Sequence, residues 1–181
     1  MLEDGLLDVA LIYDNELGDA NSKIEAVPIG ELPSMVLLSA DNKLAEKRFL
    51  TFADLKDEKF VMPMRSVHPE KLNAIIAACA ENHFVPNICA YERQFTNIVL
   101  QVKAQNAIFI TPYVRSAAAD DGIVFVPLVD FAYKYKVSLC WLKKSANPAI
   151  EKLTEVLQEN GEKTVTKADT RAQMRKKMKK S

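Results

Sequence analysis

The sequence predicts an α/β fold in which a largely parallel sheet packs against helices. Between residues 5 and 160, short apolar runs alternate with segments of helical periodicity, a pattern typical of strands joined by crossover helices. The chain has 181 residues, of which 49% are hydrophobic and 27% are charged. That composition is enough to bury one sizeable core or two small lobes that share a hinge.

Seven segments are predicted to be strands because they are rich in β-branched residues, leucine and aromatic residues. They are Leu7–Tyr13, Met35–Ser39, Phe60–Met62, Ile88–Tyr91, Ala107–Thr111, Ile123–Leu128 and Tyr135–Leu142. With helices between them, these strands account for the predicted sheet.

Two helices are predicted in the middle of the chain. The first begins at Pro69, a residue suited to the first turn of a helix, and the second runs from about Thr96 to Lys103. The apolar stripe of the first comprises Leu72, Ile75, Ile76, Cys79 and Phe84, and that of the second comprises Ile98, Val99 and Val102. Each stripe is expected to lie on a sheet.

Two further helices have start signals, at Thr111-Pro112 and at Asn147-Pro148. The latter helix is amphipathic through Ile150, Leu153, Val156 and Leu157. It is expected to end near Gly161, because glycine readily adopts the left-handed conformation of a C-cap.

Residues 161–181 are predicted to be a disordered basic tail, because they have almost no apolar residues and end in a cluster of lysines. They carry eight basic and two acidic side chains, which leaves residues 1–160 with sixteen basic and twenty-two acidic ones. A body with a net charge of −6 repels phosphate. We favour a solubilising role for the tail over a nonspecific contact with DNA.

The cysteine and histidine content argues against a disulfide framework and against a metal site. Cys79, Cys89 and Cys140 are odd in number, lie in apolar surroundings and form no CxxC motif, so we expect reduced core thiols. Only His68 and His83 can supply imidazole, and no metal or other cofactor is expected. No stretch approaches the ~18 apolar residues of a membrane span, and no signal peptide is evident, so the cytoplasm is the expected compartment.

Several short motifs occur in a specific order along the chain. Gly5–Ile12 (GLLDVALI) opens it, Pro28-Ile29 precedes the strand that ends at Ser39, Leu44-Ala45 and Thr51–Leu55 follow, and a turn at Ala104–Ile108 closes at Thr111-Pro112. Over residues 2–159 this order resembles the effector domain of LysR-type transcriptional regulators. The sequence departs from the family pattern where Gln105 and Ala107 replace glycines and where Asn42-Lys43 replaces His-Pro. Asn106 is able to take the left-handed conformation that such a turn requires.

The resemblance implies a two-lobed fold of the periplasmic-binding-protein type (type II), with a ligand cleft between the lobes and the first lobe incomplete. We assign residues 1–41 to the first lobe, 42–130 to the second, and 131–160 to the return into the first. Ser39, Ala40, Asp41 and Asn42 are expected to be the hinge of the outgoing crossover. The return crossover is expected near Val129–Tyr133.

The family's DNA-binding helix-turn-helix and the start of its first lobe are expected to lie outside this sequence. The missing pieces would leave one edge of the strand Leu7–Tyr13 uncovered, so we expect poor solubility or abnormal association. The resemblance implies homodimers or tetramers for complete proteins, but that assembly is doubtful for this fragment. Contact with DNA is expected only through the absent helix-turn-helix.

Candidate ligand-binding residues follow three predicted strands, where helix N-termini present free N–H groups. They are Met64, Arg65 and Ser66 after the strand Phe60–Met62, Arg93, Gln94, Phe95 and Thr96 after Ile88–Tyr91, and Thr111 at the end of Ala107–Thr111. Two arginines at such positions indicate a small, anionic effector. The alternatives are solvated surface arginines and, for Thr111, a simple helix cap.

No catalytic residues are assigned. The chain has no G-x-S-x-G motif and, with five glycines in all, no glycine-rich phosphate loop. We therefore do not expect an enzyme, and the resemblance implies an effector sensor. The alternatives are a solute-binding receptor of the periplasmic type, an enzyme on the same two-lobed fold, and a truncated remnant without a function of its own.

Overall fold

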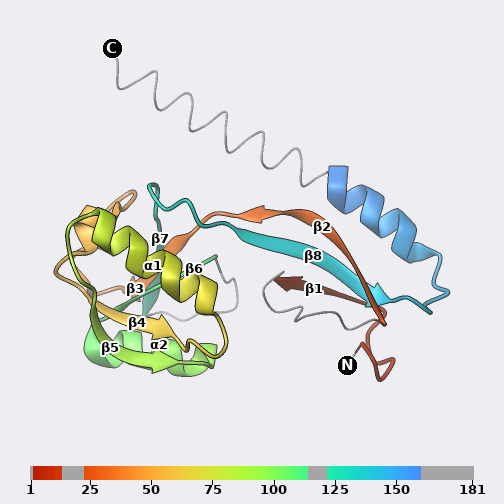
Figure 1. Ribbon diagram of the computed structural model, residues 1–181, viewed down its shortest axis with the longest axis horizontal. Coiled ribbons are helices and arrows are strands. Elements are labelled where there is room, and N and C mark those ends of the chain that lie inside the picture. Colours follow the sequence, from red (N-terminus) through yellow and green to blue (C-terminus); the bar gives the residue numbers. More distant parts are fainter. Residues whose placement is uncertain (1, 14–22, 114–121, 160–181) are drawn as a thin grey trace, which may run out of the picture. The chain divides into compact units, whose positions relative to one another are not determined.

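The computed structural model describes residues 2–13, 23–113 and 122–159, and the chain divides into two compact units (Figure 1). Met1–Leu32 and Tyr135–Ser181 form the first unit, and Pro33–Lys134 form the second unit. The chain therefore passes from one unit to the other after residue 32 and returns after residue 134. Both positions differ from the boundaries expected after residues 41 and 130.

The first unit contains a three-stranded antiparallel sheet in the order β1-β8-β2, formed by β1 (Val9–Tyr13), β2 (Ile24–Leu32) and β8 (Tyr135–Leu142). The strands predicted at Leu7–Tyr13 and Tyr135–Leu142 are confirmed as β1 and β8. Because β8 lies between the other two, its centre is the buried part of the sheet, at Ser138, Leu139 and Cys140.

The sequence pattern does not predict β2. Pro28 and Gly30 lie within this strand, and the pairing register with β8 shifts between them. Proline lacks an N–H donor and is confined to edge strands or bulges, so it weakens the strand signal in the sequence. Both conditions that tolerate proline hold here, because β2 is an edge strand with an irregular register.

A helix over residues 149–159 follows β8, as the Asn147-Pro148 signal predicts. The Oδ1 atom of Asn147 accepts a hydrogen bond from the backbone N–H of Ala149 at 3.0 Å, which caps the first turn. Ile150 is buried, whereas Leu153 and Val156 are exposed, so the helix buries less of its apolar stripe than expected. Its expected end near Gly161 and the tail 161–181 lie outside the described residues.

The second unit contains a five-stranded sheet in the order β5-β4-β6-β3-β7. Its strands are β3 (Met35–Ser39), β4 (Lys59–Pro63), β5 (Asn87–Glu92), β6 (Ile108–Thr111) and β7 (Ile123–Pro127). β4 runs parallel to β5 and β6, whereas β3 runs antiparallel to β6 and β7. All five strands are confirmed. The expectation of a largely parallel sheet is wrong, because an apolar run predicts a strand but not its direction. Parallel neighbours need a crossover helix between them.

The crossover helices α1 (Pro69–Glu81) and α2 (Phe95–Gln105) join β4 to β5 and β5 to β6, and both are confirmed near their predicted positions (Figure 1). They cover opposite faces of the sheet. Successive strand residues point to opposite sides, and the two helices pack against alternate residues of the same strands. The α1 cluster contains Leu72, Ile75 and Cys79 with strand residues such as Phe60, Met62, Ile108 and Ile110. The α2 cluster contains Ile98 and Val102 with Leu37, Val61 and Phe109. Ile76, expected in the buried stripe of α1, is partly exposed.

A short 3-10 helix, η2 (Phe52–Leu55), lies between β3 and β4. The Asp54 carboxylate accepts hydrogen bonds from the backbone N–H of Thr51 at 2.9 Å and from its hydroxyl at 3.0 Å. Lys47 donates a further hydrogen bond to Asp54, and this contact is the main reason that the pKa of Asp54 is lowered. These bonds fix the start of η2.

Asn106 ends α2 in the left-handed conformation, with φ of 48°. This confirms the expectation that asparagine takes that conformation where family members usually have glycine nearby. The helix predicted to open at Thr111-Pro112 falls largely on residues 114–121, outside the described part of the chain.

The expected hinge residues Ser39, Ala40, Asp41 and Asn42 all lie inside the second unit. Asn42 has only 3% of its surface exposed, and its Nδ2 atom donates to Glu58 Oε2 at 2.9 Å and to Asn106 Oδ1 at 3.2 Å. Its Oδ1 atom accepts from the backbone N–H of Leu44 at 2.8 Å. These bonds tie the segment to the second unit, and the chain changes units at residues 32–33. The hinge assignment stays a prediction.

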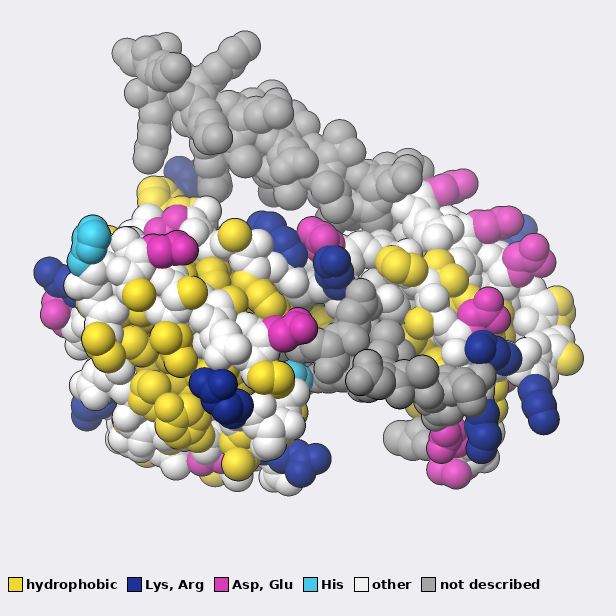
Figure 2. All heavy atoms as spheres, in the orientation of Figure 1, with side chains coloured by type: hydrophobic (Ala, Val, Ile, Leu, Met, Phe, Trp, Pro, Cys, Tyr) yellow, Lys and Arg dark blue, Asp and Glu magenta, His cyan; other side chains and the backbone are white. Residues whose placement is uncertain are grey.

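Both units expose hydrophobic side chains (Figure 2), and in the first unit they include Leu6 and Leu11 of the β1 region. Among the described strands, none pairs with the outer edge of β1, and Leu11 has 60% of its surface exposed. The other edge strand, β2, carries a proline and the charged residues Glu25 and Glu31, which discourage pairing with another chain. β1 has no such protection.

We expect Leu11→Lys to reduce self-association of the chain, because a charge on an edge strand blocks strand pairing. The weight-average mass measured by light scattering should fall toward that of the monomer. Ala26→Lys, which adds the same charge to exposed β2, should leave the mass unchanged. Equal association of the Leu11→Lys variant and the unchanged chain would contradict the assignment of β1 as the associating edge.

We expect Asn42→Ala to lower the free energy of unfolding by about 1–3 kcal/mol, because it leaves buried polar partners without hydrogen bonds. Urea unfolding followed by circular dichroism measures this change. Asn73→Ala removes an exposed asparagine from α1 and should cost less than about 0.5 kcal/mol. A similarly small cost for Asn42→Ala would show that the segment is held by something other than this network.

Candidate functional site

The candidate ligand-binding residues lie together at one edge of the second unit's sheet. β4, β5 and β6 run parallel, so their carboxyl ends share an edge, and all three candidate segments begin there. The backbone N–H of Met64 donates to the carbonyl of Glu92 at 3.1 Å, which joins the first two segments directly. We call this region the carboxyl edge. The structure thus brings the candidate residues together, while their role in binding stays a prediction.

The segment after β4 forms a tight turn before α1. The Met64 carbonyl accepts hydrogen bonds from the N–H groups of Val67 at 2.9 Å and His68 at 3.1 Å. Met64, Arg65 and Ser66 are therefore held at the surface, and Met64 has 41% of its surface exposed. Within the described part of the chain, the Arg65 guanidinium has no ion pair.

The segment after β5 leads into α2. Gln94 is the N-cap residue in an extended conformation, its side chain makes no capping bond, and its carbonyl accepts from the N–H of Ile98 at 3.1 Å. Arg93 and Thr96 are exposed, and among the described residues Arg93 also has no ion pair. Phe95 is half-buried against the α2 cluster, so it packs in the core more than it forms the expected aromatic wall.

The segment after β6 differs because its threonine is buried. Thr111 has 4% of its surface exposed and pairs with Met35 of β3. Pro112 is buried as well, whereas Tyr113 is 53% exposed and packs edge-on against Phe125, with 5.1 Å between ring centroids. Thr111 therefore lies beneath the surface that the other candidate residues form.

The sheet splits at the carboxyl edge between β4 and β6, a feature that the sequence does not reveal. The two strands pair only at Phe60 and Ile108, although β4 continues to Pro63 and β6 to Thr111. The connection from β4 leads to β5 on one side, and β6 leads to β7 on the other. In open α/β sheets, such a reversal of strand order is where ligands bind.

Lys71, in the first turn of α1, is a second feature missed by sequence reasoning. Only 5% of its surface is exposed, and its Nζ atom lies 4.1 Å from the centre of the Phe109 ring. Lys71, Ile75 and Ala78 recur at helical spacing, and the other two are also buried. Because a lysine in a helix is usually solvated, this spacing alone does not predict a buried lysine.

Tyr133 lies in the second unit, and the Glu70 carboxylate of α1 acts on its phenol electrostatically. Its ring stacks on Phe131, with 5.8 Å between centroids, and its carbonyl accepts a hydrogen bond from the Ser34 hydroxyl at 3.0 Å. Burial raises the pKa of the Tyr133 phenol, and the Glu70 carboxylate raises it further. The phenol therefore stays neutral at physiological pH.

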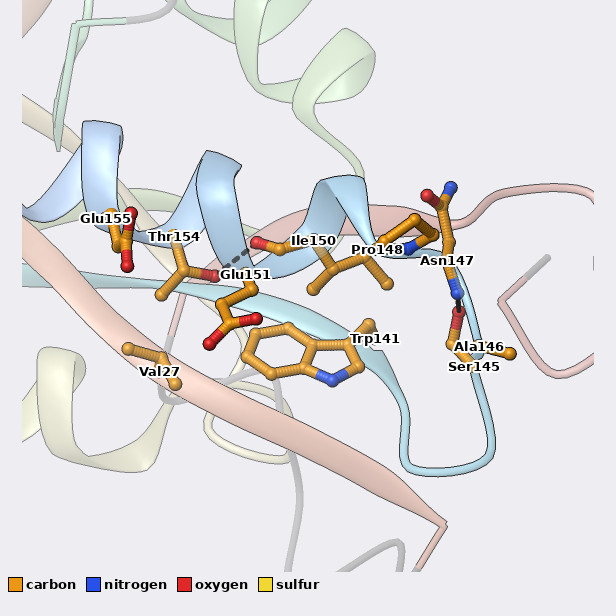
Figure 3. Close-up of a pocket in the computed structure, with 10 residues that line it drawn as sticks. All are labelled: Val27, Trp141, Ser145, Ala146, Asn147, Pro148, Ile150, Glu151, Thr154 and Glu155. Carbon is orange, nitrogen blue, oxygen red and sulfur yellow. Dashed lines mark hydrogen bonds between the residues drawn. The ribbon is translucent and has the colours of Figure 1, made fainter.

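The first unit has a groove of its own, between the sheet and the helix over residues 149–159 (Figure 3). Its volume is about 490 Å³, and Val27 and Trp141 form its floor. Its lining includes two carboxylates, Glu151 and Glu155, but no lysine or arginine. The Thr154 hydroxyl donates to the Ile150 carbonyl of its own helix at 2.8 Å. The groove is poorly suited to an anion, and none of the expected site residues lines it.

The described residues include neither a metal-binding cluster nor a membrane-spanning helix. Over residues 2–13, 23–113 and 122–159, no group of three or more His, Cys, Asp or Glu side chains is placed to hold a metal ion. Burial raises the pKa of Cys79 to about 11, so this thiol stays protonated. Within the same residues, no helix has the length and apolar character needed to cross a membrane.

Comparison with known proteins gives one family. The family model described as the LysR substrate binding domain matches residues 1–162. No curated protein sequence matches the chain.

Solved structures of LysR-type regulators resemble the chain in fold. The effector binding domain of QuiR in complex with shikimate has a TM-score of 0.59 at 20% identity, over 90% of this chain and 75% of QuiR's. The BenM effector binding domain with benzoate has a TM-score of 0.61 at 19% identity, over 87% and 71% of the two chains. Full-length CbnR bound to its target DNA has a TM-score of 0.63 at 18% identity, over 88% and 55%. The chain thus spans little more than half of that full-length regulator.

These matches confirm the predicted fold class, an α/β fold of the periplasmic-binding-protein-like type II class with two sheets. They also confirm the resemblance drawn from the order of the sequence motifs. The chain belongs to the LysR substrate-binding domain family.

Proposed function

We propose that this chain is the effector-sensing part of a LysR-type transcriptional regulator and that it binds a small anionic metabolite at the carboxyl edge of β4, β5 and β6. The observation that carries the proposal is the position of Arg65 and Arg93. Both are exposed at this edge, and within the described residues neither has an ion pair. Guanidinium groups without partners are suited to bind a carboxylate through paired hydrogen bonds.

The chemistry around the arginines supports a ligand that also has an apolar part. Met64 and Tyr113 expose hydrophobic surface at the same edge. The QuiR domain was solved with shikimate and the BenM domain with benzoate, and both ligands are ring carboxylates. We extend that ligand class, a carboxylate on a small ring, to this chain.

Regulation would follow from a difference in affinity between two conformations. A ligand that binds one arrangement of the two units more tightly shifts the population toward it, and the DNA-binding part of a longer protein responds to that shift. CbnR, which contains such a part, was solved on its target DNA. A role in transcription also implies a cytoplasmic protein without catalytic activity.

We expect the double variant Arg65→Ala/Arg93→Ala to bind benzoate and shikimate at least about tenfold more weakly than the unchanged chain, because charge-assisted hydrogen bonds are lost. Isothermal titration calorimetry measures the affinities.

The matched control is Lys56→Ala/Lys59→Ala, which removes two exposed cations near the start of β4, at the opposite edge of the sheet. It changes the net charge equally and should change neither affinity by more than about twofold. Equal losses in the two double variants would mean that general electrostatic attraction, and not this edge, binds the anions.

A further inference from the structure

The groove of the first unit combines an apolar floor with acidic side chains. Val27 and Trp141 form the floor, Ile150 adds apolar lining, and the volume of about 490 Å³ is that of a ligand-sized site. Glu151 and Glu155 also line the groove, and Figure 3 shows the Glu151 carboxylate beside the Trp141 ring. Aromatic rings and carboxylates both attract cations. The groove is therefore suited to a partner with both apolar and basic side chains.

Carboxylates recur every four residues along the helix over residues 149–159. Glu151, Glu155 and Glu159 are exposed, and within the described residues none of them has an ion pair. We call these three residues the acidic row. Residues four apart are neighbours on the surface of a helix, so the like charges repel one another and destabilise the helix. A basic partner along the acidic row would relieve this repulsion.

The chain itself contains a segment with the complementary pattern. Residues 161–181 carry eight basic and two acidic side chains, a net charge of +6, whereas residues 1–160 have a net charge of −6. Five basic residues of the tail recur every four residues, which is the spacing of the acidic row, and we call them the basic row: Lys163, Lys167, Arg171, Arg175 and Lys179. Met174 and Met178 add apolar side chains, which pack favourably on aromatic rings.

The tail is long enough to reach the groove, and it starts nearby. From Glu159 back to Glu151 the helix spans about 12 Å, because each residue of a helix rises about 1.5 Å. The tail of 21 residues reaches up to about 70 Å when extended. Gly161 permits a sharp turn at its start. Exposed ion pairs are individually weak, but a segment joined to its binding site has a high effective concentration there.

We propose that the basic tail turns back along the helix over residues 149–159 of its own chain and occupies the groove. The basic row pairs with the acidic row in reverse order, so that Lys167 lies against Glu155 and Arg171 against Glu151. The residues that follow cover the apolar floor. The cations of the tail are then paired within the protein and are not available to DNA. This inference is independent of the proposed function, which concerns the second unit.

The fluorescence of Trp141 tests the proposal, because Trp141 is the only tryptophan of the chain and lies in the floor of the groove. Quenching by acrylamide measures how far its ring is open to solvent. In the full chain, Lys163→Glu/Lys167→Glu/Arg171→Glu should raise the quenching constant at least about twofold, because like charges then repel the tail from the acidic row. The unchanged chain should show a similar rise in 1 M salt, where the Debye length is only about 3 Å.

The matched control is Lys176→Glu/Lys177→Glu/Lys180→Glu, which makes the same change in net charge outside the basic row. At physiological salt it should leave the quenching constant near that of the unchanged chain. Equal rises in the two triple variants would overturn the pairing of the two rows. If the basic-row variant shows no rise but loses affinity for a short DNA duplex, the tail is a DNA contact and the inference fails.

Dilution separates binding within one chain from binding between two chains. Over an approximately hundredfold range of concentration, the quenching constant of the unchanged chain should stay constant, because intramolecular binding does not depend on concentration. A constant that rises on dilution would show that the tail binds a second copy, and it would overturn the inference.

Cross-linking of the unchanged chain covers the case in which the variants do not fold. A carbodiimide joins a carboxylate to an amine that is in contact with it, and the amide bond forms as the reagent takes up the water that is lost. Mass spectrometry of the cross-linked monomer should find Lys167 joined to Glu155 or Glu151. A helix that simply continued in one direction would separate Lys167 from Glu155 by about 18 Å, too far for this reaction. If Lys167 is joined to neither glutamate, the inference fails.

Discussion

The parallel pairing of β4 with β5 and β6 is the constraint on which the candidate site depends. Each parallel pair requires a crossover helix, and α1 and α2 provide these helices on opposite faces. With the three strands in one direction, Met64–Ser66, Arg93–Thr96 and Thr111 must emerge at one edge. An antiparallel arrangement of any of the three would move its segment to the far edge. The antiparallel strand β3 instead supplies the buried centre of the unit.

Exposed cations distinguish the carboxyl edge from the groove of the first unit. Arg65 and Arg93 lie at the surface of this edge, and within the described residues neither has an ion pair. The lining of the groove includes two glutamates and no basic residue, so the groove is a weaker candidate for binding an anion.

Sequence reasoning recovers what depends on local pattern. Strand residues such as those of β8, the start of α1 at Pro69 and the left-handed turn at Asn106 follow from propensity, start signals and backbone sterics. Sequence reasoning misses features that depend on which strands pair with one another. Pro28 makes β2 hard to predict. Proline is tolerated in an edge strand but not in a central one, and the sequence does not show which strands lie at an edge. The split between β4 and β6 is likewise not predictable, because it requires knowing which strands are neighbours. The hydrogen bonds of Asn42 are also not predictable, because its partners Glu58 and Asn106 are distant in sequence.

The central claim is that the second unit binds its ligand at the carboxyl edge of β4, β5 and β6. Crystals of the chain grown with 4-bromobenzoate test it directly, because bromine scatters anomalously and its position is found without assumptions about the site. The account predicts an anomalous peak beside Met64–Ser66 and Thr111, within carboxylate-binding distance of the basic residues. A peak confined to the first unit's groove beside Trp141 would contradict it.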